Sequence, residues 1–175
     1  MRGPSEGQTF RTQGPSGRER SLEGKKQHRR LFNSASVEVE KCTFCRIAKG
    51  ELPSHRVYED ERYIAFLDNY PFSRGHTLVC PREHGETIWD MEEPEIGGLF
   101  RTASRVSRAV VEATGADGFR FVQNNGEAAN QAVTHVHVHV IPVMMEDKVR
   151  SMTRIKMDQR EMEATAEAIR RALRS

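Results

Sequence analysis

The segment "THVHVHVIP", residues 134–142, places three of the chain's seven histidines at alternate positions. Such alternation is typical of a β-strand, in which successive side chains point to opposite faces. We therefore expect His135, His137 and His139 to share one face, while the valines between them enter a core. At a rise of about 3.3 Å per residue, His135 and His139 lie roughly 13 Å apart, too far for one metal ion to bind all three. The pattern favours one working histidine with neighbours that orient it, because imidazole can attack an electrophile or move a proton.

The rest of the chain supplies elements that could pair with this strand. Alternating or β-rich runs predict five strands, two within residues 56–69 and one each at 76–81, 118–124 and 134–141. Apolar residues at helical spacing predict a helix over 93–115, and the spacing of Asp158 and Glu161 predicts a capping box that begins a second helix over about 158–174. We expect an α+β domain with a five-stranded antiparallel sheet and two main helices.

Composition and charge divide the chain into a basic tail and a domain. Residues 1–36 hold eight Lys or Arg against three Glu and few aliphatic side chains, so we expect a disordered basic tail before a domain over 37–175. This tail has three possible interpretations. It is a solvated extension, a segment with a weak contact to nucleic acid or a membrane surface, or an organellar transit peptide. No apolar run approaches the roughly 20 residues that span a bilayer, and no signal-peptide core is present. We expect a cytoplasmic protein, without a membrane or a firm nucleic-acid partner.

The three cysteines fit a reducing compartment better than a disulfide framework. Cys42 and Cys45 have the Cys-x-x-Cys spacing of a zinc knuckle, for which a redox pair is the rival. Cys80 lies inside an apolar run and is predicted to be a core residue. Upstream of the histidines, the loop 124–131, "NNGEAANQ", offers several neutral amides, which suit the oxygens of a phosphate group.

The run His-Val-His-Val-His-Val-Ile at 135–141 matches the pattern His-φ-His-φ-His-φ-φ, in which φ is apolar. Upstream stand the Cys-x-x-Cys pair, "GHTLV" and "NNGEAA", in an order that resembles the histidine triad (HIT) family, in its Hint-like and bacterial branch. The resemblance covers about residues 42–142. It implies an enzyme that cleaves the α-phosphorus linkage of a purine nucleotide derivative, such as an AMP phosphoramidate or a dinucleoside polyphosphate, through a nucleotidyl-histidine intermediate.

The resemblance also implies roles for individual residues. His137 is the nucleophile, with His135 and His139 beside it in the triad. The implied nucleotide-binding residues fall into three groups. Asn124 and Gln131 contact the phosphate, Asp68 contacts the ribose, and the base is contacted by Phe44, Ile47 and Phe66. For the two phenylalanines plain core packing remains an alternative, and Asp68 could merely end a strand.

The bacterial branch further implies a structural zinc site. Its four ligands here are Cys42, Cys45, His84 and His135. His76 and His55 have no expected role beyond the surface or the surroundings of the site. Two positions depart from the family pattern, because Ala132 stands where many relatives have a hydroxyl near the leaving group and Asn130 stands where glycine is common.

Other functions remain open at this point. The same intermediate could transfer a nucleotidyl group to an acceptor other than water. The chain could be a nucleotide-binding regulatory module with weak activity, or a zinc hydrolase in which His135 and His137 bind a catalytic ion. The resemblance implies a homodimer, for which the helix over 94–114 has enough apolar surface.

Overall fold

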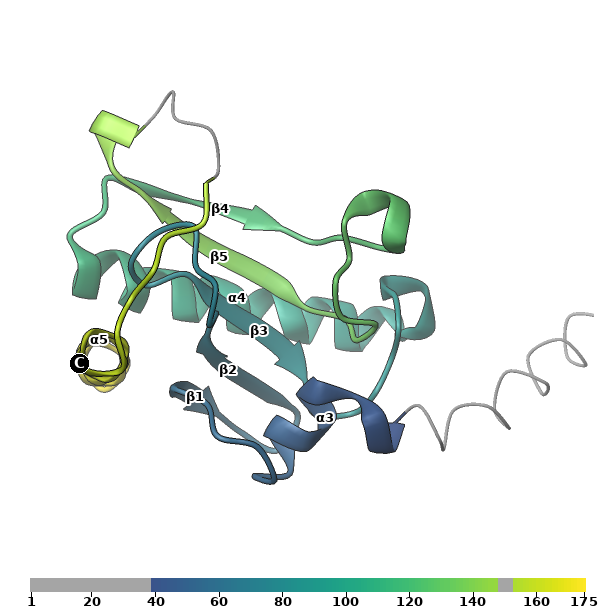
Figure 1. The fold of residues 1–175 in the computed structure, drawn as a ribbon. Coiled ribbons are helices and arrows are strands. Elements are labelled where there is room, and N and C mark those ends of the chain that lie inside the picture. The colour runs from purple at the N-terminus through teal and green to yellow at the C-terminus, as the bar shows by residue number, and fades with distance from the viewer. Residues whose placement is uncertain (1–38, 148–152) are drawn as a thin grey trace, which may run out of the picture. The chain divides into compact units, whose positions relative to one another are not determined.

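The computed structural model describes residues 39–147 and 153–175, which form a sheet with helices on both faces (Figure 1). The strands are β1 (Arg56–Glu59), β2 (Tyr63–Leu67), β3 (Thr77–Pro81), β4 (Gly118–Val122) and β5 (Val138–Val143). Their order in the sheet is β1-β2-β3-β5-β4, and every neighbouring pair is antiparallel. The predicted α+β fold with five antiparallel strands is confirmed, whereas the predicted tail over 1–36 lies outside the described residues.

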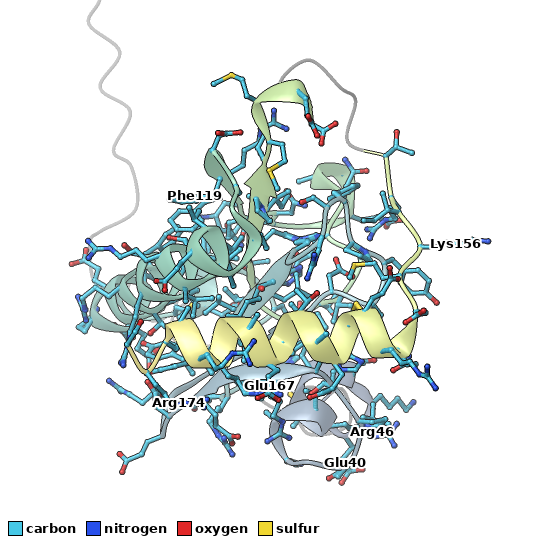
Figure 2. All side chains as sticks on the ribbon, turned by 90° about the vertical axis from the view of Figure 1, so that its left-hand side faces the viewer. Glu40, Arg46, Phe119, Lys156, Glu167 and Arg174 are labelled. Atoms are coloured by element: carbon cyan, nitrogen blue, oxygen red, sulfur yellow. The ribbon has the colours of Figure 1, made fainter. Side chains whose placement is uncertain are left out.

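Two long helices, α4 (Glu93–Thr114) and α5 (Gln159–Ala172), cover one face of the sheet. Their apolar stripes meet in one core, where Val106 of α4 and Ile169 of α5 are fully buried beside Val138 of β5. Asp158 caps α5 by accepting a hydrogen bond from the backbone N–H of Glu161 at 2.8 Å. Figure 2 shows the outer side of α5, which carries charged residues. These helices fix the sheet from behind and leave its other face for the site.

A short helix, α3 (Thr43–Ala48), packs on that other face. Phe44 contacts Phe66 with ring centroids 5.3 Å apart, and both belong to a second core with Ile64 and Leu78. Strand β2 is therefore buried on both faces, because its alternate side chains enter the two different cores. Three short 3-10 helices complete the described elements, at Ile88–Asp90 (η1), Glu127–Ala129 (η2) and Met145–Asp147 (η3).

The strand predicted over 134–141 begins later than expected, at Val138. The register pairs Val138 with Val79 of β3, and two pairs further along it would bring Val136 opposite Pro81. Proline has no N–H to donate, so the ladder stops there, and the N–H of Val136 bonds instead to the carbonyl of Gly85 at 2.7 Å. Val136 still enters the first core at 0% exposure, so the predicted division of valines and histidines between two faces holds beyond the strand.

No helix in the two described segments is long and apolar enough to cross a membrane.

Candidate functional site

A cavity of about 710 Å³ opens on the face of the sheet that carries α3, a size typical of small-molecule sites. Most of the catalytic and nucleotide-binding residues expected from the sequence line it. They are Phe44, Ile47, Phe66, Asp68, Asn124, His137 and His139. The structure thus brings together side chains from α3, the end of β2, the loop after β4 and the histidine segment. Phe44, Ile47 and Phe66 also pack in the second core, so their two expected roles are compatible.

His137 is held in one tautomer by the backbone. Its Nδ1 lies 2.6 Å from the carbonyl oxygen of His135, and a carbonyl can only accept, so Nδ1 carries the proton. The other nitrogen, Nε2, is therefore the unprotonated one. Phe44 packs edge-on against this ring at 5.1 Å, and the ring lines the cavity. His137 therefore offers a lone pair for attack on an electrophile.

His139 is oriented by His76, for which we expected no role beyond the surface or the surroundings of the site. His76 is fully buried, and its Nδ1 accepts the backbone N–H of Phe72 at 3.2 Å. Its Nε2 must then carry the proton, which it donates to Nδ1 of His139 at 2.9 Å. His139 is consequently protonated at Nε2, so it presents a hydrogen-bond donor next to the lone pair of His137.

Burial keeps these histidines neutral near pH 7. It lowers the pKa of His139 to about 3, with the neighbouring His137 and His76 adding to the effect. Burial likewise lowers the pKa of His76 to about 4 against the opposing charge of Asp68, and it lowers the pKa of His137. The contact of 3.5 Å between His76 and Asp68 is therefore no ion pair at neutral pH. A neutral His137 is the form that can act as a nucleophile.

Asp68 lines the cavity, and among the described residues only one of its two carboxylate oxygens accepts a hydrogen bond. Its Oδ1 accepts the backbone N–H of Tyr70 at 2.8 Å. Its Oδ2 lies 3.6 Å from Nη1 of Arg154 and is not hydrogen-bonded to it. Oδ2 can therefore accept a hydrogen bond from a bound molecule, for example from a hydroxyl group. The strand-end position of Asp68 is compatible with this role.

Gln131, expected at a phosphate, points elsewhere. Its Oε1 accepts the N–H of Gly126 and its Nε2 donates to the carbonyl of Glu86, each at 2.6 Å, and it is absent from the cavity wall. Its amide therefore braces the loop that carries Asn124. Asn130 and Ala132 do line the cavity. Asn130 adopts the left-handed conformation, with φ of 62°, which asparagine tolerates better than most residues, so it can replace a glycine here.

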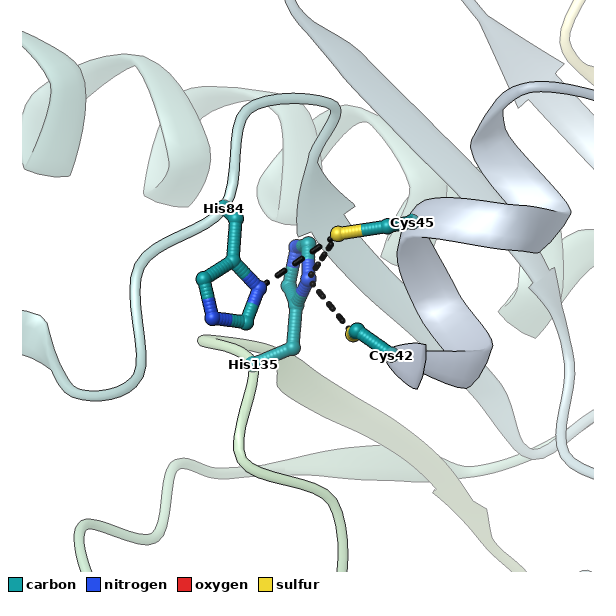
Figure 3. A group of neighbouring side chains, drawn as sticks. All are labelled: Cys42, Cys45, His84 and His135. Atoms are coloured by element: carbon teal, nitrogen blue, oxygen red, sulfur yellow. Dashed lines mark hydrogen bonds between the residues drawn. The ribbon is translucent and has the colours of Figure 1, made fainter. Parts of the chain in front are cut away.

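Four predicted metal ligands converge at the edge of the cavity wall (Figure 3). Sγ of Cys42 and Sγ of Cys45 lie 3.4 and 3.5 Å from Nδ1 of His135, and Sγ of Cys45 lies 3.4 Å from Nδ1 of His84. In a tetrahedral zinc site with Zn–S bonds of about 2.3 Å and Zn–N bonds of about 2.05 Å, sulfur and nitrogen are roughly 3.5 Å apart. The donor set and its spacing therefore fit zinc.

The surroundings of this cluster also suit a metal. Nε2 of His135 donates to the carbonyl of Pro81 at 2.9 Å, which leaves the lone pair on Nδ1, the atom that faces the sulfurs. Burial lowers the pKa of His135 to about 4, so the ring is neutral, as a ligand must be. Burial together with Cys42 raises the pKa of Cys45 to about 12 in the absence of an ion. A bound cation would reverse this preference and stabilise the thiolates.

A second group of potential ligands consists of Asp68 and His139, which line the cavity, and the buried His76. Here the two imidazole nitrogens are only 2.9 Å apart, whereas two nitrogens on one tetrahedral zinc ion are roughly 3.4 Å apart. A hydrogen bond explains this distance better than a shared ion. His137 belongs to neither group of potential ligands among the described residues, so the geometry does not favour a catalytic ion on His135 and His137.

Two residues of the site were not expected from the sequence, namely Arg154, which lines the cavity, and His76, which lies behind His139. His76 follows Gly75 within the motif "GHTLV", so its position in a known pattern was the available signal. Arg154 carries no such signal, because 86 positions separate it from Asp68 and only the folded chain brings the two together.

Comparisons with known proteins show what this chain is similar to. A family model described as the HIT domain matches residues 49–146. A HIT-like protein of Mycobacterium tuberculosis is 40% identical, over 75% of this chain and 92% of that protein. An adenosine 5'-monophosphoramidase of Schizosaccharomyces pombe is 36% identical, over 61% of this chain and 77% of that protein. An adenylylsulfatase of Arabidopsis thaliana is 39% identical over 58% of this chain, which spans about half of that protein, 51%.

Solved structures give the same answer for the fold. A Zn-bound histidine triad family protein from Mycobacterium smegmatis superimposes with a TM-score of 0.70 at 38% identity, covering 76% of this chain and 93% of that chain. A histidine triad nucleotide-binding protein from Sulfolobus tokodaii has a TM-score of 0.70 at 36% identity, covering 76% and 92%.

Proposed function

This chain belongs to the histidine triad (HIT) family, and we propose that it is a nucleotide hydrolase that cleaves the α-phosphorus linkage of purine nucleotide derivatives. The observation that carries the proposal is the pair of tautomers at the cavity, with a lone pair on Nε2 of His137 and an N–H on Nε2 of His139. Nucleophilic displacement at phosphorus is favoured by a lone pair that attacks and a neighbouring donor that stabilises the charge on the phosphoryl oxygens. The names of the relatives from fission yeast and Arabidopsis support adenylyl substrates.

The reaction proceeds in two displacements. Nε2 of His137 attacks the α-phosphorus, a P–N bond forms, and the bond to the leaving group breaks as that group takes the electron pair and a proton from solvent, which the water of the second displacement returns. The imidazole becomes cationic, and the carbonyl of His135 on its Nδ1–H stabilises this charge. Water then attacks the same phosphorus and releases the nucleoside monophosphate and free His137. Transfer to another acceptor would use the same first step.

The other cavity residues bind and orient the substrate. His139 donates to an oxygen at the phosphorus, where Asn124 supplies an amide. Oδ2 of Asp68 accepts from the ribose, and Phe44, Ile47 and Phe66 enclose the base. Ala132 gives the leaving group no hydroxyl donor, so we expect slower turnover than in relatives that have one, by roughly the 1–3 kcal/mol of a lost hydrogen bond. The loop still supplies neutral amides there.

We propose structural zinc on Cys42, Cys45, His84 and His135, supported by the fit of the donor atoms and by the zinc-bound relative from Mycobacterium smegmatis. When bound, the ion supplies folding energy and a fixed position for His135. Because the carbonyl of His135 accepts from His137, this site also fixes the ring that attacks. Arg56 and Arg82 donate to the last carbonyls of α3, at Ile47 and Ala48, and so hold the cysteine helix on the sheet.

A panel of adenosine and guanosine phosphoramidates and dinucleoside polyphosphates tests the function. We expect release of nucleoside monophosphate, fastest from phosphoramidates, because Arg154 is the single cation at neutral pH among the described residues that line the cavity, too little charge for a polyphosphate chain. Chromatography of the products measures it. Failure of every compound to yield a monophosphate, with nucleotide binding intact, would favour the regulatory-module alternative.

The buried His76 gives a prediction about rate. Replacing His76 with leucine removes the donor to His139 and should lower kcat by about 10- to 100-fold, the effect of one lost hydrogen bond of 1–3 kcal/mol. His76→Gln keeps a donor at nearly the same place and should retain most of the rate. Nitrogen NMR of the His139 ring reads its tautomer directly. The control is His55→Leu, which alters a histidine bonded to Gln159 and Glu163. A decrease in kcat as large as that of His76→Leu in this control would contradict the proposed role of His76.

The homodimer stays a prediction, but the structure changes where we place it. The apolar residues of α4 that we expected to serve it, including Leu99, Val106 and Val110, are fully buried within the monomer. Phe119 and Phe121 lie exposed on β4, an edge strand of the sheet. We therefore place the surface on β4, and sedimentation equilibrium would reveal the mass.

A further inference from the structure

Arg154 lies at the cavity although it comes from outside the segment that matches the HIT domain, residues 49–146. The backbone N–H of the next residue, Ile155, donates to the carbonyl of Pro71 at 2.7 Å. The guanidinium itself donates through Nη1 to the carbonyl of Tyr70 and stacks over the ring of Phe72 at 4.7 Å. Three contacts thus fasten a segment near the C-terminus to the loop that follows β2 and Asp68.

This arginine is the only cation at neutral pH among the described residues that line the cavity, and Asp68 is the only anion. The two are 3.6 Å apart, close enough to attract but without a hydrogen bond. The side chain of Arg154 is half exposed, and beyond Tyr70 no other described residue accepts its N–H groups. A planar guanidinium with open donors matches the oxygens of a phosphate.

We propose that Arg154 is a specificity-determining residue for substrates that carry a phosphate group on the ribose, at the 2' or 3' hydroxyl. The inference rests on the proposed function, in which Oδ2 of Asp68 binds the ribose. The ribose hydroxyl that stays free can donate to Oδ2 at about 2.7 Å, which puts its oxygen at most about 6 Å from Nη1 of Arg154. A phosphate ester on the neighbouring hydroxyl can span a gap of this size. The positive charge of Arg154 also offsets the repulsion between Asp68 and such a phosphate.

The rival role of Arg154 is to orient Asp68 for an unmodified ribose. The two roles predict different losses of kcat/KM when the charge of Arg154 is removed. A role in orienting Asp68 affects all substrates, whereas a role in phosphate binding affects the phosphorylated substrate most. Full-length protein is assayed with adenosine 5'-phosphoramidate and with its 2'- and 3'-phosphorylated forms, which also distinguish the two hydroxyls. We expect the wild type to cleave one phosphorylated form with a kcat/KM at least equal to that of the parent compound.

Arg154→Gln should lower kcat/KM for that phosphorylated form by about 10- to 100-fold, and for the parent by less than about threefold. Arg154→Lys keeps the charge but not the planar guanidinium with its paired donors, so its kcat/KM for the phosphorylated form should lie between those of Arg154→Gln and the wild type. Lys156→Gln is the matched control, because Lys156 is exposed on the same segment and projects away from the domain (Figure 2). This control should have the wild-type kcat/KM for all three substrates.

Rejection of both phosphorylated substrates by the wild type would overturn the proposal, and so would equal losses on all substrates in Arg154→Gln. If no substrate is turned over at all, calorimetry with AMP, adenosine 2',5'-bisphosphate and adenosine 3',5'-bisphosphate separates this inference from the proposed hydrolysis. Weaker binding of a bisphosphate alone in Arg154→Gln supports it. Unchanged binding of both bisphosphates contradicts it.

Discussion

We expect His137→Asn to abolish turnover, by at least about 10⁴-fold, while AMP still binds. The lone pair on Nε2 of His137 is the proposed nucleophile, and an asparagine amide has no comparable lone pair to attack phosphorus. The amide can still donate to the carbonyl of His135, so the cavity keeps its shape. Steady-state assays and calorimetry with AMP measure the two effects separately.

An acid-labile adduct should accompany this result. Quenching the wild type during turnover should leave a nucleotidyl group on His137, which peptide mass spectrometry locates. The control is His139→Ala, which removes the neighbouring donor and keeps the nucleophile, so it should still form an adduct, more slowly. Turnover by His137→Asn at the wild-type rate would remove the proposed mechanism altogether.

The second large effect concerns the metal. Cys42→Ser should lose zinc and lower the melting temperature by roughly 10 °C, because an incomplete tetrahedron no longer contributes its binding energy to folding. Turnover should fall only indirectly, as His135 loosens and with it the carbonyl that holds His137. Elemental analysis of the purified wild type should give about one zinc per chain.

Two variants separate the metal site from the reaction. Cys80→Ala removes a buried cysteine that is not among the four grouped ligands, so it should keep zinc and lose only the stability of a small packing defect. His139→Ala should keep zinc and stability and lose rate. Metal-free wild type with full stability and activity would show that Cys42 and Cys45 are ordinary thiols.

The elements with strong local patterns were predictable. Strand β2 and helices α4 and α5 follow from alternation, from helical spacing and from end signals such as Asp158 and Gly115, which takes a left-handed conformation with φ of 70°. These signals act between residues close in sequence. The start of β5 was predicted wrongly because it depends on Pro81, which lies on another strand and cannot continue the ladder.

The candidate site also has some features that the sequence predicts and others that depend on residues far apart in the sequence. The triad "HVHVH" by itself determined that its histidines and valines face opposite sides, because that follows from the period of an extended chain. The resemblance named four metal ligands, which the fold brings within 4.8 Å of one another from positions up to 93 residues apart. Sequence similarity was enough to identify the four ligands. The spacing of their donor atoms, in contrast, depends on the packing of α3 on the sheet.

Only the tertiary structure decided which nitrogen of each histidine is available. The lone pair of His137 depends on a backbone carbonyl, and the donor of His139 depends on the buried His76 and on the N–H of Phe72. The same holds for Gln131, whose amide the loop uses internally, and for Arg154, which reaches the cavity from the C-terminal segment. The sequence determined which chemical groups are present. The long-range hydrogen bonds determined their protonation and direction, because a tautomer is set by whichever partner the fold places beside each nitrogen.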